Sequence, residues 1–209
     1  MAGRSPATVF LIDDDPSVRK ALTRLIRSAG YQVQAFASAQ DFLECGTGAH
    51  EDSACLVLDV RMPGLSGLDL QRELSATTTP LPIIFITGHG DIPMTVKAMK
   101  NGAVDFLPKP VEGKELLKAV EQALARADEE SRERQQLEDI QRRLETLTPR
   151  ERDVMALVVR GLLNKQIAFE LGTAEKTVKV HRARVMEKME VQSLAELVHI
   201  ADRVDFGKA

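Results

Sequence analysis

The chain has 209 residues, of which 44% are apolar and 28% charged, a composition that excludes a disordered or collagen-like chain. Apolar runs such as Val9–Ile12 and Ile83–Ile86 are far too short to span a bilayer, and no apolar signal segment precedes them. We therefore expect a cytoplasmic protein with no membrane partner. Its two cysteines, Cys45 and Cys55, make no disulfide framework, so both are expected to be packing thiols.

The net charge of −3 is unevenly distributed along the chain. Residues 160–188 carry seven Lys or Arg against three Asp or Glu. A basic stretch in an otherwise acidic chain favours a polyanionic partner for that part alone.

The first 120 or so residues alternate short apolar runs with amphipathic helical patterns. Most of the runs are almost continuously apolar, as expected for strands buried on both faces. The second run alternates apolar and polar residues, which is typical of an edge strand. The βαβ rhythm predicts an α/β domain with a doubly wound, flavodoxin-like, five-stranded parallel sheet. The predicted strands are residues 8–12, 31–36, 55–58, 83–86 and 104–107.

Polar side chains follow four of these strands. Asp13 and Asp14 end the first, Asp59 the third, Thr87 the fourth and Lys109 the fifth. The carboxyl ends of neighbouring parallel strands share one edge, where ligands bind. Clustered carboxylates require a cation, and oxygen ligands favour Mg²⁺; such a site can form and hold an aspartyl phosphate. Taken singly, each residue has an alternative as a turn, cap or solvated residue.

The chain from 114 to 148 lacks proline and glycine and is rich in strong helix formers. We expect a helical spacer there, with a short coiled coil across a dimer as the alternative. A capping box formed by Thr148 and Glu151, with Pro149 at the first helical position, starts a new all-α domain. The predicted division is residues 1–125, linker 126–147 and residues 148–209. A second apolar stripe precedes that boundary, formed by Leu137, Ile140, Leu144 and Leu147.

The last domain carries the spacing of a helix-turn-helix. Ala168 is the small residue where two helices touch, Gly172 is in the turn, and Val178 locks the second helix. Thr173 is the candidate cap of that helix, predicted at 175–189.

Projection of the 175–189 helix at 100° per residue turns a basic face outward when Val178 points inward. Such a face suits a DNA major groove, and the flanking Arg182 and Lys188 suit phosphates. The alternative is a solvated amphipathic helix. The residues that face outward are Lys176, Lys179, Val180, Ala183 and Arg184.

Asp13-Asp14 and the segments 59–64, 87–90 and 106–110 together resemble the receiver domain of two-component response regulators, over residues 8 to about 125. The resemblance implies that Asp59 accepts a phosphoryl group from a sensor histidine kinase. It also implies Mg²⁺ as cofactor, held by Asp14, Asp59, Asp13 and the backbone carbonyl of Arg61.

By the same resemblance, Thr87 and Lys109 stabilise the phosphoryl group, and Phe106 is an aromatic switch that turns inward. A plain core role is the alternative for Phe106. Arg61 and His89 flank the site, and our hypothesis is that they affect the lifetime of the phosphate by screening or positioning the hydrolytic water. A plain loop histidine is the alternative for His89.

The segment from Leu147 to His181 resembles a LuxR-type output domain, so the chain is similar to the NarL/FixJ family of response regulators, on the FixJ side. The resemblance implies a homodimer when phosphorylated and binding to double-stranded promoter DNA, with RNA polymerase as a further candidate partner. The dimer face would be residues 93–101 with 104–107. The candidate DNA contacts are Lys176, Thr177, Lys179, Val180, Arg182, Ala183, Arg184 and Lys188.

Two other functional classes are alternatives to a transcription regulator. An Mg²⁺-dependent phosphatase with an aspartate nucleophile would place a second acid two residues after Asp59, where this chain has Arg61. We therefore expect no enzyme, beyond slow self-phosphorylation from small phosphodonors and slow self-dephosphorylation. The other class is a phosphorylation-controlled protein or RNA binder, with the helical domain as an interaction module. Single-stranded RNA readers usually display stacking aromatic residues, and the basic helix has none, which counts against the RNA version.

Overall fold

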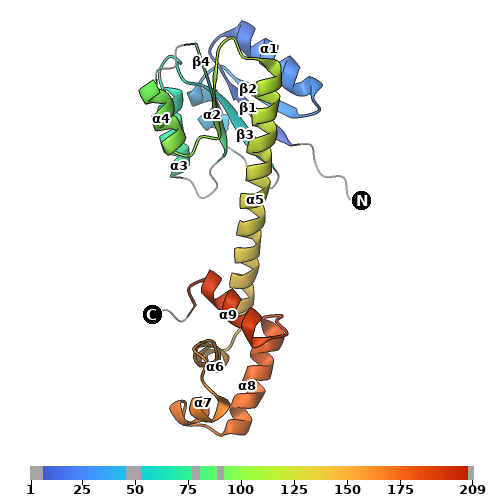
Figure 1. Cartoon of the computed structure of the whole chain (residues 1–209), viewed down its shortest axis with the longest axis vertical. Helices are drawn as coiled ribbons and strands as arrows, with labels where there is room; N and C mark the ends of the chain where they lie inside the picture. The colour runs from blue at the N-terminus through green and yellow to red at the C-terminus, as the bar shows by residue number, and fades with distance from the viewer. Residues whose placement is uncertain (1–6, 46–52, 77–80, 89–91, 207–209) are drawn as a thin grey trace. The chain divides into compact units, whose positions relative to one another are not determined.

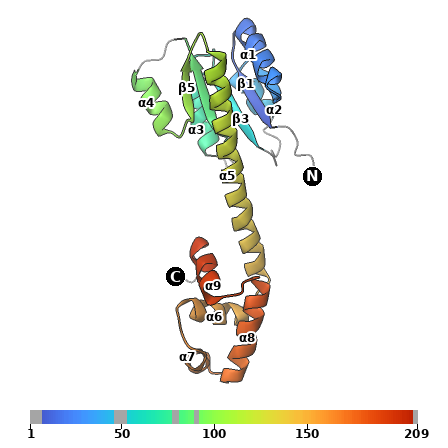
Figure 2. The same cartoon turned by 45° about the vertical axis from the view of Figure 1, so that its right-hand side comes forward.

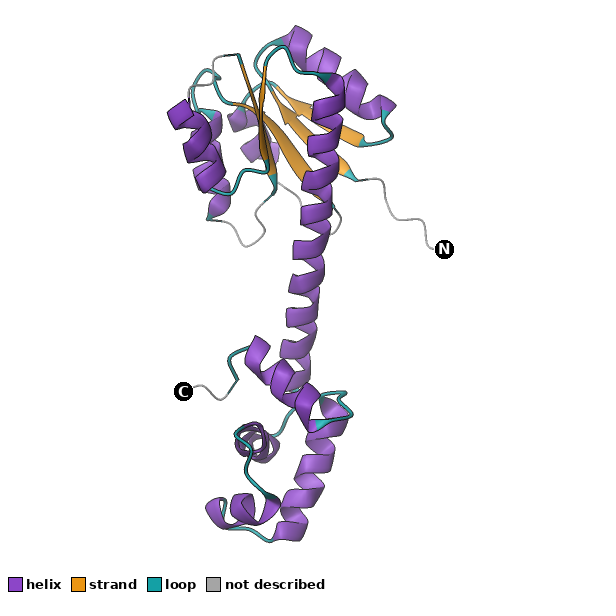
Figure 3. Cartoon of the chain, viewed as in Figure 1, coloured by secondary structure: helices purple, strands orange, loops and turns teal. Residues whose placement is uncertain are grey.

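The computed structural model describes residues 7–45, 53–76, 81–88 and 92–206 (Figures 1 and 3). It divides into two compact units, Met1–Ser131 and Arg132–Ala209, and helix α5 (Gly113–Glu145) contributes residues to both. No helix among the described residues is long and apolar enough to cross a bilayer. The other elements of the first unit are β1 (Thr8–Ile12), α1 (Pro16–Ser28), β2 (Gln32–Phe36), α2 (Ala39–Cys45), β3 (Ala54–Asp59), α3 (Gly67–Ser75), β4 (Ile83–Thr87), α4 (Ile92–Lys100) and β5 (Asp105–Pro108).

The five strands form one sheet in the order β2-β1-β3-β4-β5, and all four pairings are parallel. The predicted doubly wound sheet is confirmed, and β2 lies at an edge as its alternating pattern indicated. β3 and β4 are fully buried along their lengths, because helices cover both faces. This order brings the carboxyl ends of β1, β3, β4 and β5 side by side.

Alternate residues of the strands point into two separate apolar layers. One layer joins the sheet to α1 and α5, through side chains such as Ile26 and Val120. The other joins it to α2, α3 and α4, through side chains such as Phe42 and Leu70. Figure 2 shows these helices around the sheet. The sheet is thus held rigidly between helices, and its carboxyl edge is a stable platform for polar side chains.

The described part of the second unit, which ends at residue 206, is all-α, as predicted, with four helices after α5. Thr148 caps the first of them through a complete capping box with Glu151, and Pro149 occupies the first turn. The helices pack around a core that includes Val154, Ile167 and Val185. They are α6 (Pro149–Val159), α7 (Asn164–Glu170), α8 (Glu175–Lys188) and α9 (Leu194–Arg203).

The C-terminal part of α5 belongs to the core of the second unit. Ile140, Leu144 and Leu147 are each less than a tenth exposed and pack with α6 and α8 residues. Leu137, expected in the same stripe, is 39% exposed, so the buried stripe begins one turn later than the sequence indicated. Part of the segment expected to be a spacer therefore stabilises the folded second unit.

Candidate functional site

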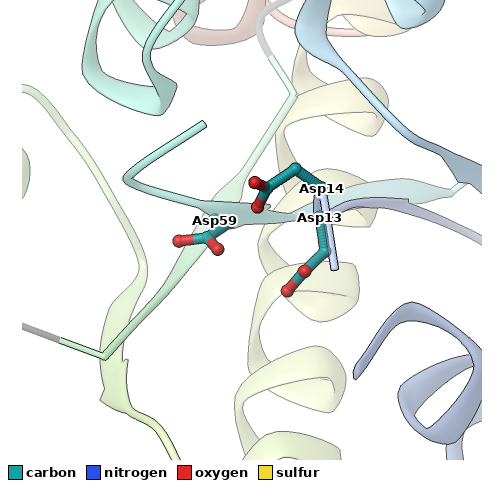
Figure 4. Close-up of side chains that lie close together, drawn as sticks. All are labelled: Asp13, Asp14 and Asp59. Carbon is teal, nitrogen blue, oxygen red and sulfur yellow. The ribbon is translucent and has the colours of Figure 1, made fainter. Parts of the chain in front are cut away.

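Three carboxylates meet at the carboxyl edge of the sheet. Asp13 and Asp14 follow β1, Asp59 ends β3, and each offers one oxygen within 4.8 Å of the others (Figure 4). Asp13 and Asp59 are buried, whereas Asp14 is exposed. The strand order places them together, as expected from the sequence.

Lys109 neutralises part of this negative charge. Its ammonium donates a hydrogen bond to Asp59 Oδ2 at 2.5 Å and lies 2.8 Å from Asp13 Oδ2. Burial raises the pKa of Asp13 despite the nearby ammonium. Burial alone would lower the pKa of Lys109, but its hydrogen bonds to Asp13 and Asp59 outweigh that effect and raise it. One cation thus bridges the two buried carboxylates.

The carboxylate pocket fits a divalent cation. Asp13 Oδ2 is buried and, apart from the ion pair with Lys109, accepts no hydrogen bond from the described residues. One ammonium does not balance three carboxylates, and three oxygens within 4.8 Å of one another form a hard, all-oxygen donor set that suits Mg²⁺. The residues that would hold the ion are Asp13, Asp14 and Asp59.

Backbone groups fix the orientation of the carboxylates. The Arg61 N–H donates to Asp59 Oδ1 at 3.1 Å, and the Asp15 N–H donates to Asp13 Oδ1 at 2.9 Å. Asp15 itself caps α1 by accepting from the backbone N–H groups of Ser17 and Val18. Each buried aspartate therefore keeps its second oxygen directed at Lys109.

The remaining pocket residues lie on β4 and β5. Thr87 is the last residue of β4 and only 2% exposed. Phe106, on β5, is half-buried, and its ring centroid lies 6.0 Å from that of Phe85. His89 lies outside the described residues. The switching roles of Thr87 and Phe106 stay predictions.

Gly67 is a site residue that sequence reasoning missed. It begins α3, and its N–H donates to the Val60 carbonyl at 3.0 Å. A Cβ at this position would collide with the carbonyl oxygen of Asp59. Only glycine permits this close approach of α3 to the end of β3. The sequence gives no sign of this requirement beyond the presence of a glycine where a helix begins.

The basic face predicted for the second unit is present on α8. Val178, Val185 and Met189 are buried, while His181 and Arg182 are half-buried at the flanks. Lys179 forms an exposed ion pair with Glu175 at 3.2 Å, and Arg182 Nη1 donates to Asn164 Oδ1 at 3.2 Å. The exposed residues on this face are Lys176, Thr177, Lys179, Val180, Ala183 and Arg184.

The turn before α8 has the expected geometry with one correction. Ala168 and Val178 are buried, and Gly172 has φ of 61°, a left-handed conformation that favours glycine. The prediction that Thr173 caps α8 is wrong, because Ala174 is the N-cap residue. The Thr173 N–H instead donates to the Ala168 carbonyl at 2.9 Å and closes the preceding turn.

Lys188, predicted to contact phosphate, already binds groups within its own unit. Its ammonium donates to Glu151 Oε2 at 2.6 Å and to the Thr146 carbonyl at 2.8 Å. Glu151 is 2% exposed. The hydrogen bond from Lys188, followed by that from the Thr148 N–H, lowers the pKa of Glu151 to about 2. The sequence signalled Glu151 only as part of a capping box, and nothing local to it indicated the partner 37 residues away.

Comparison with known proteins agrees with the structures of both units. Residues 9–121 match the family model for the response regulator receiver domain, and residues 145–201 match that for bacterial regulatory proteins of the LuxR family. The chain belongs to the response regulators.

Full-length relatives extend the match over both units of this response regulator. It is 54% identical to Nodulation protein W of Bradyrhizobium diazoefficiens, covering 94% of this chain and 86% of the relative. It is 45% identical to the transcriptional regulatory protein FixJ of the same organism, covering 93% and 94%. The solved structure of response regulator StyR is similar, with 52% identity, a TM-score of 0.84, and coverage of 95% of this chain and all of that one.

The regulator is therefore a two-component protein with a LuxR-type DNA-binding domain, and its function is transcription regulation. The resemblance to the FixJ side of the family, expected from the sequence, is confirmed. A classical enzyme is the wrong class for this combination of domains.

Proposed function

We propose that Asp59 accepts a phosphoryl group from a phosphohistidine of a sensor histidine kinase, and that this aspartyl phosphate promotes dimerisation and promoter binding. The observation that carries the proposal is the position of Asp59: its carboxylate is buried, lies beside two further aspartates and is bound by Lys109. The residue divisions 1–125, 126–147 and 148–209 are proposed as the receiver, linker and DNA-binding parts, acting in the cytoplasm.

The chemistry is the transfer of one phosphoryl group from a histidine nitrogen to an aspartate oxygen. An oxygen of Asp59 attacks phosphorus, the N–P bond of the phosphohistidine breaks, and the released imidazole nitrogen takes up a proton. Bound Mg²⁺, held by Asp13, Asp14, Asp59 and the Arg61 carbonyl, would offset the negative charge that converges on the transferring group. Lys109 binds Asp59 before transfer and pairs with the phosphoryl oxygens afterwards.

Two side chains on neighbouring strands would then change position in response to the phosphoryl group. The Thr87 hydroxyl would donate to a phosphoryl oxygen, and Phe106 would turn into the space that Thr87 leaves. Because Phe106 is only half-buried, it has room for a second rotamer. The transfer from small phosphodonors and the slow hydrolysis of the aspartyl phosphate would use the same groups.

Arg61 is proposed to slow hydrolysis of the aspartyl phosphate. It is exposed and lies two residues after Asp59, where its side chain can cover the approach of water. We expect Arg61→Ala to shorten the half-life of the phosphorylated protein by about threefold, measured by loss of label after removal of the phosphodonor. Arg24→Ala, at an exposed position on α1, is the control. An unchanged half-life would remove Arg61 from this role.

Dimerisation is proposed to use α4 and β5. Ile92, Val96 and Met99 are exposed by 81%, 45% and 43%, and their spacing places them on one stripe of α4. An exposed apolar stripe of this kind is typical of an interaction surface.

Val96→Glu should weaken the phosphorylated dimer by about tenfold or more, because a carboxylate would be desolvated at the interface. Sedimentation of the phosphorylated protein over a range of concentrations measures this effect. Leu43→Glu, which introduces the same charge at an exposed leucine on α2, should dimerise normally. Equal dimerisation of both variants would place the interface elsewhere.

DNA binding is proposed through the outward face of α8, which is basic and carries two small apolar side chains, Val180 and Ala183. Such a face can enter a major groove and contact base edges or a thymine methyl. Lys179 is expected to leave Glu175 for DNA, and Arg182 is placed at the flank, where phosphates lie. Lys188 remains a predicted phosphate contact that would have to share its ammonium with Glu151.

A duplex selected from a random pool tests this assignment. Lys179→Ala should weaken binding to the selected duplex by about tenfold to a hundredfold at fixed salt, while binding to unrelated duplexes falls less. Arg203→Ala removes one exposed positive charge on α9 and is the control. Loss of affinity in both variants to the same extent would show a general charge effect. The absence of any selective binding would support an interaction module instead.

A further inference from the structure

The C-terminal end of α8 is bound by a side chain of α5. Arg143 lies in the last turn of α5. Its Nη1 donates to the Met189 carbonyl at 3.1 Å, and its Nη2 lies 2.9 Å from Glu190 Oε2. Asp139, one turn earlier on α5, binds the same Nη2. The guanidinium is therefore held between α5 and the end of the helix that carries the proposed DNA-binding face.

The Met189 carbonyl is a group that requires a donor. The last carbonyls of a helix have no partner within it, and Met189 is both the C-cap residue of α8 and fully buried. A buried backbone carbonyl is stable only when it accepts a hydrogen bond. Arg143 supplies the donor, and its positive charge also interacts favourably with the helix dipole at this end.

Glu190 stands where a helix end favours glycine. Its φ is 55°, in the left-handed region. Its N–H donates to the Glu187 carbonyl and the Val191 N–H to the Met186 carbonyl, both at 3.1 Å, the pattern of helix ends that usually carry glycine here. Glycine would meet the needs of the backbone with less strain. What the glutamate adds is a carboxylate, and that carboxylate binds Arg143.

We propose that Arg143 is a positioning residue for DNA recognition, because its bonds to Met189 and Glu190 fix the direction of α8. That direction places Lys179 and Val180 against base edges, so the inference rests on the DNA-binding role proposed for α8. Contacts to base edges carry the sequence information and require an exact helix position, whereas contacts to phosphates carry none. Loss of Arg143 should therefore reduce sequence selectivity more than it reduces affinity for DNA in general.

The positioning group comes from outside the part of the chain assigned to DNA binding. Arg143 precedes both the proposed DNA-binding part, residues 148–209, and the matched LuxR-family segment, residues 145–201. The linker helix would thus contribute to the specificity of the domain that follows it.

The ratio of affinities for a selected and an unrelated duplex tests this role in the full-length protein, at fixed salt after treatment with acetyl phosphate and Mg²⁺. Arg143→Met should lower the ratio about fivefold, the worth of part of one base contact. Arg142→Met removes the same charge one residue earlier, from a side chain that also pairs with Asp139 but is 74% exposed, and should keep the wild-type ratio. An unchanged ratio in Arg143→Met would overturn the proposal. Absence of any selective duplex for the wild type would instead contradict the proposed function itself.

A second variant separates positioning from damage to the fold, because Arg143→Met also leaves the Met189 carbonyl without its donor. Glu190→Gly removes the carboxylate at a φ that favours glycine. It should unfold at no lower denaturant concentration than the wild type, yet its selectivity ratio should fall about twofold to threefold. The double variant should lose no more selectivity than Arg143→Met alone, since both changes act through one contact. Lower stability with unchanged selectivity in both single variants would show that the contact only stabilises the fold, against the proposal.

Discussion

Asp59→Asn should abolish stable phosphorylation of the regulator by a small phosphodonor such as acetyl phosphate in the presence of Mg²⁺. An amide has the shape of the carboxylate but is not a nucleophile towards phosphorus, and the change also removes one anionic oxygen from the cluster. Intact-mass measurement of phosphoryl incorporation checks the result. Asp41→Asn, at an exposed position on α2, should be labelled like the wild type.

The same variant tests whether phosphorylation controls DNA binding. Wild-type protein should bind its selected duplex more tightly after treatment with the phosphodonor, whereas Asp59→Asn should show no such increase. Selective binding that is equal in both proteins under all conditions would keep the DNA-binding assignment and remove the switch. Labelling of Asp59→Asn at the wild-type level would contradict the choice of Asp59 as acceptor.

Lys188→Met should lower the free energy of unfolding of the second unit by about 2 kcal/mol, because it leaves the Glu151 carboxylate buried without its cation. Removing one partner of a buried pair usually costs more, but the Lys188 side chain is 32% exposed, and the Thr148 N–H still donates to Glu151. Denaturant unfolding of residues 132–209 measures the effect. Lys176→Met, on the exposed face of α8, is the control and should change little.

The acid dependence of stability follows from the same pair. The pKa of Glu151 falls from an ordinary value of 4.5 to about 2 in the folded protein. The paired carboxylate therefore stabilises the fold fully above pH 4.5 and progressively less as the pH falls towards 2. In Lys188→Met the folded pKa should rise, so less stability is lost over that interval. An identical acid profile in wild type and Lys188→Met would contradict the role of the pair.

The architecture of the receiver was predictable because its signals are local. Four of the five strands are short apolar runs followed by a polar residue, and the alternating pattern of residues 31–36 indicates an edge strand. The convergence of Asp13, Asp59 and Lys109 followed from parallel strands sharing one carboxyl edge. The outward face of α8 followed from helical geometry once Val178 was taken as buried.

Contacts between distant residues were not predictable in the same way. The pairing of Glu151 with Lys188 depends on how α6 packs against α8, and the requirement for glycine at position 67 depends on how closely α3 approaches β3. Thr173 has good cap chemistry, but Ala174 occupies the cap because the chain still closes the preceding turn at Thr173. The buried side-chain amide of Gln71 had no signal in the sequence, because its Nε2 donates to the carbonyls of Ala98 and Asn101 at the end of α4.

The shared helix α5 limits how such regulators can be recombined. Its first turns pack in the receiver, while its last turns supply Ile140 and Leu144 to the second unit, followed by Leu147 just after the helix. A chimera joined at residue 148 would therefore receive a new DNA-binding domain without the core residues that normally precede it, at positions 140–147. Joints within residues 132–136, where the described side chains are mostly exposed, would transfer each core intact. With joints at these positions, output domains exchanged between regulators should still fold, even where the two sequences share little beyond a helical connection.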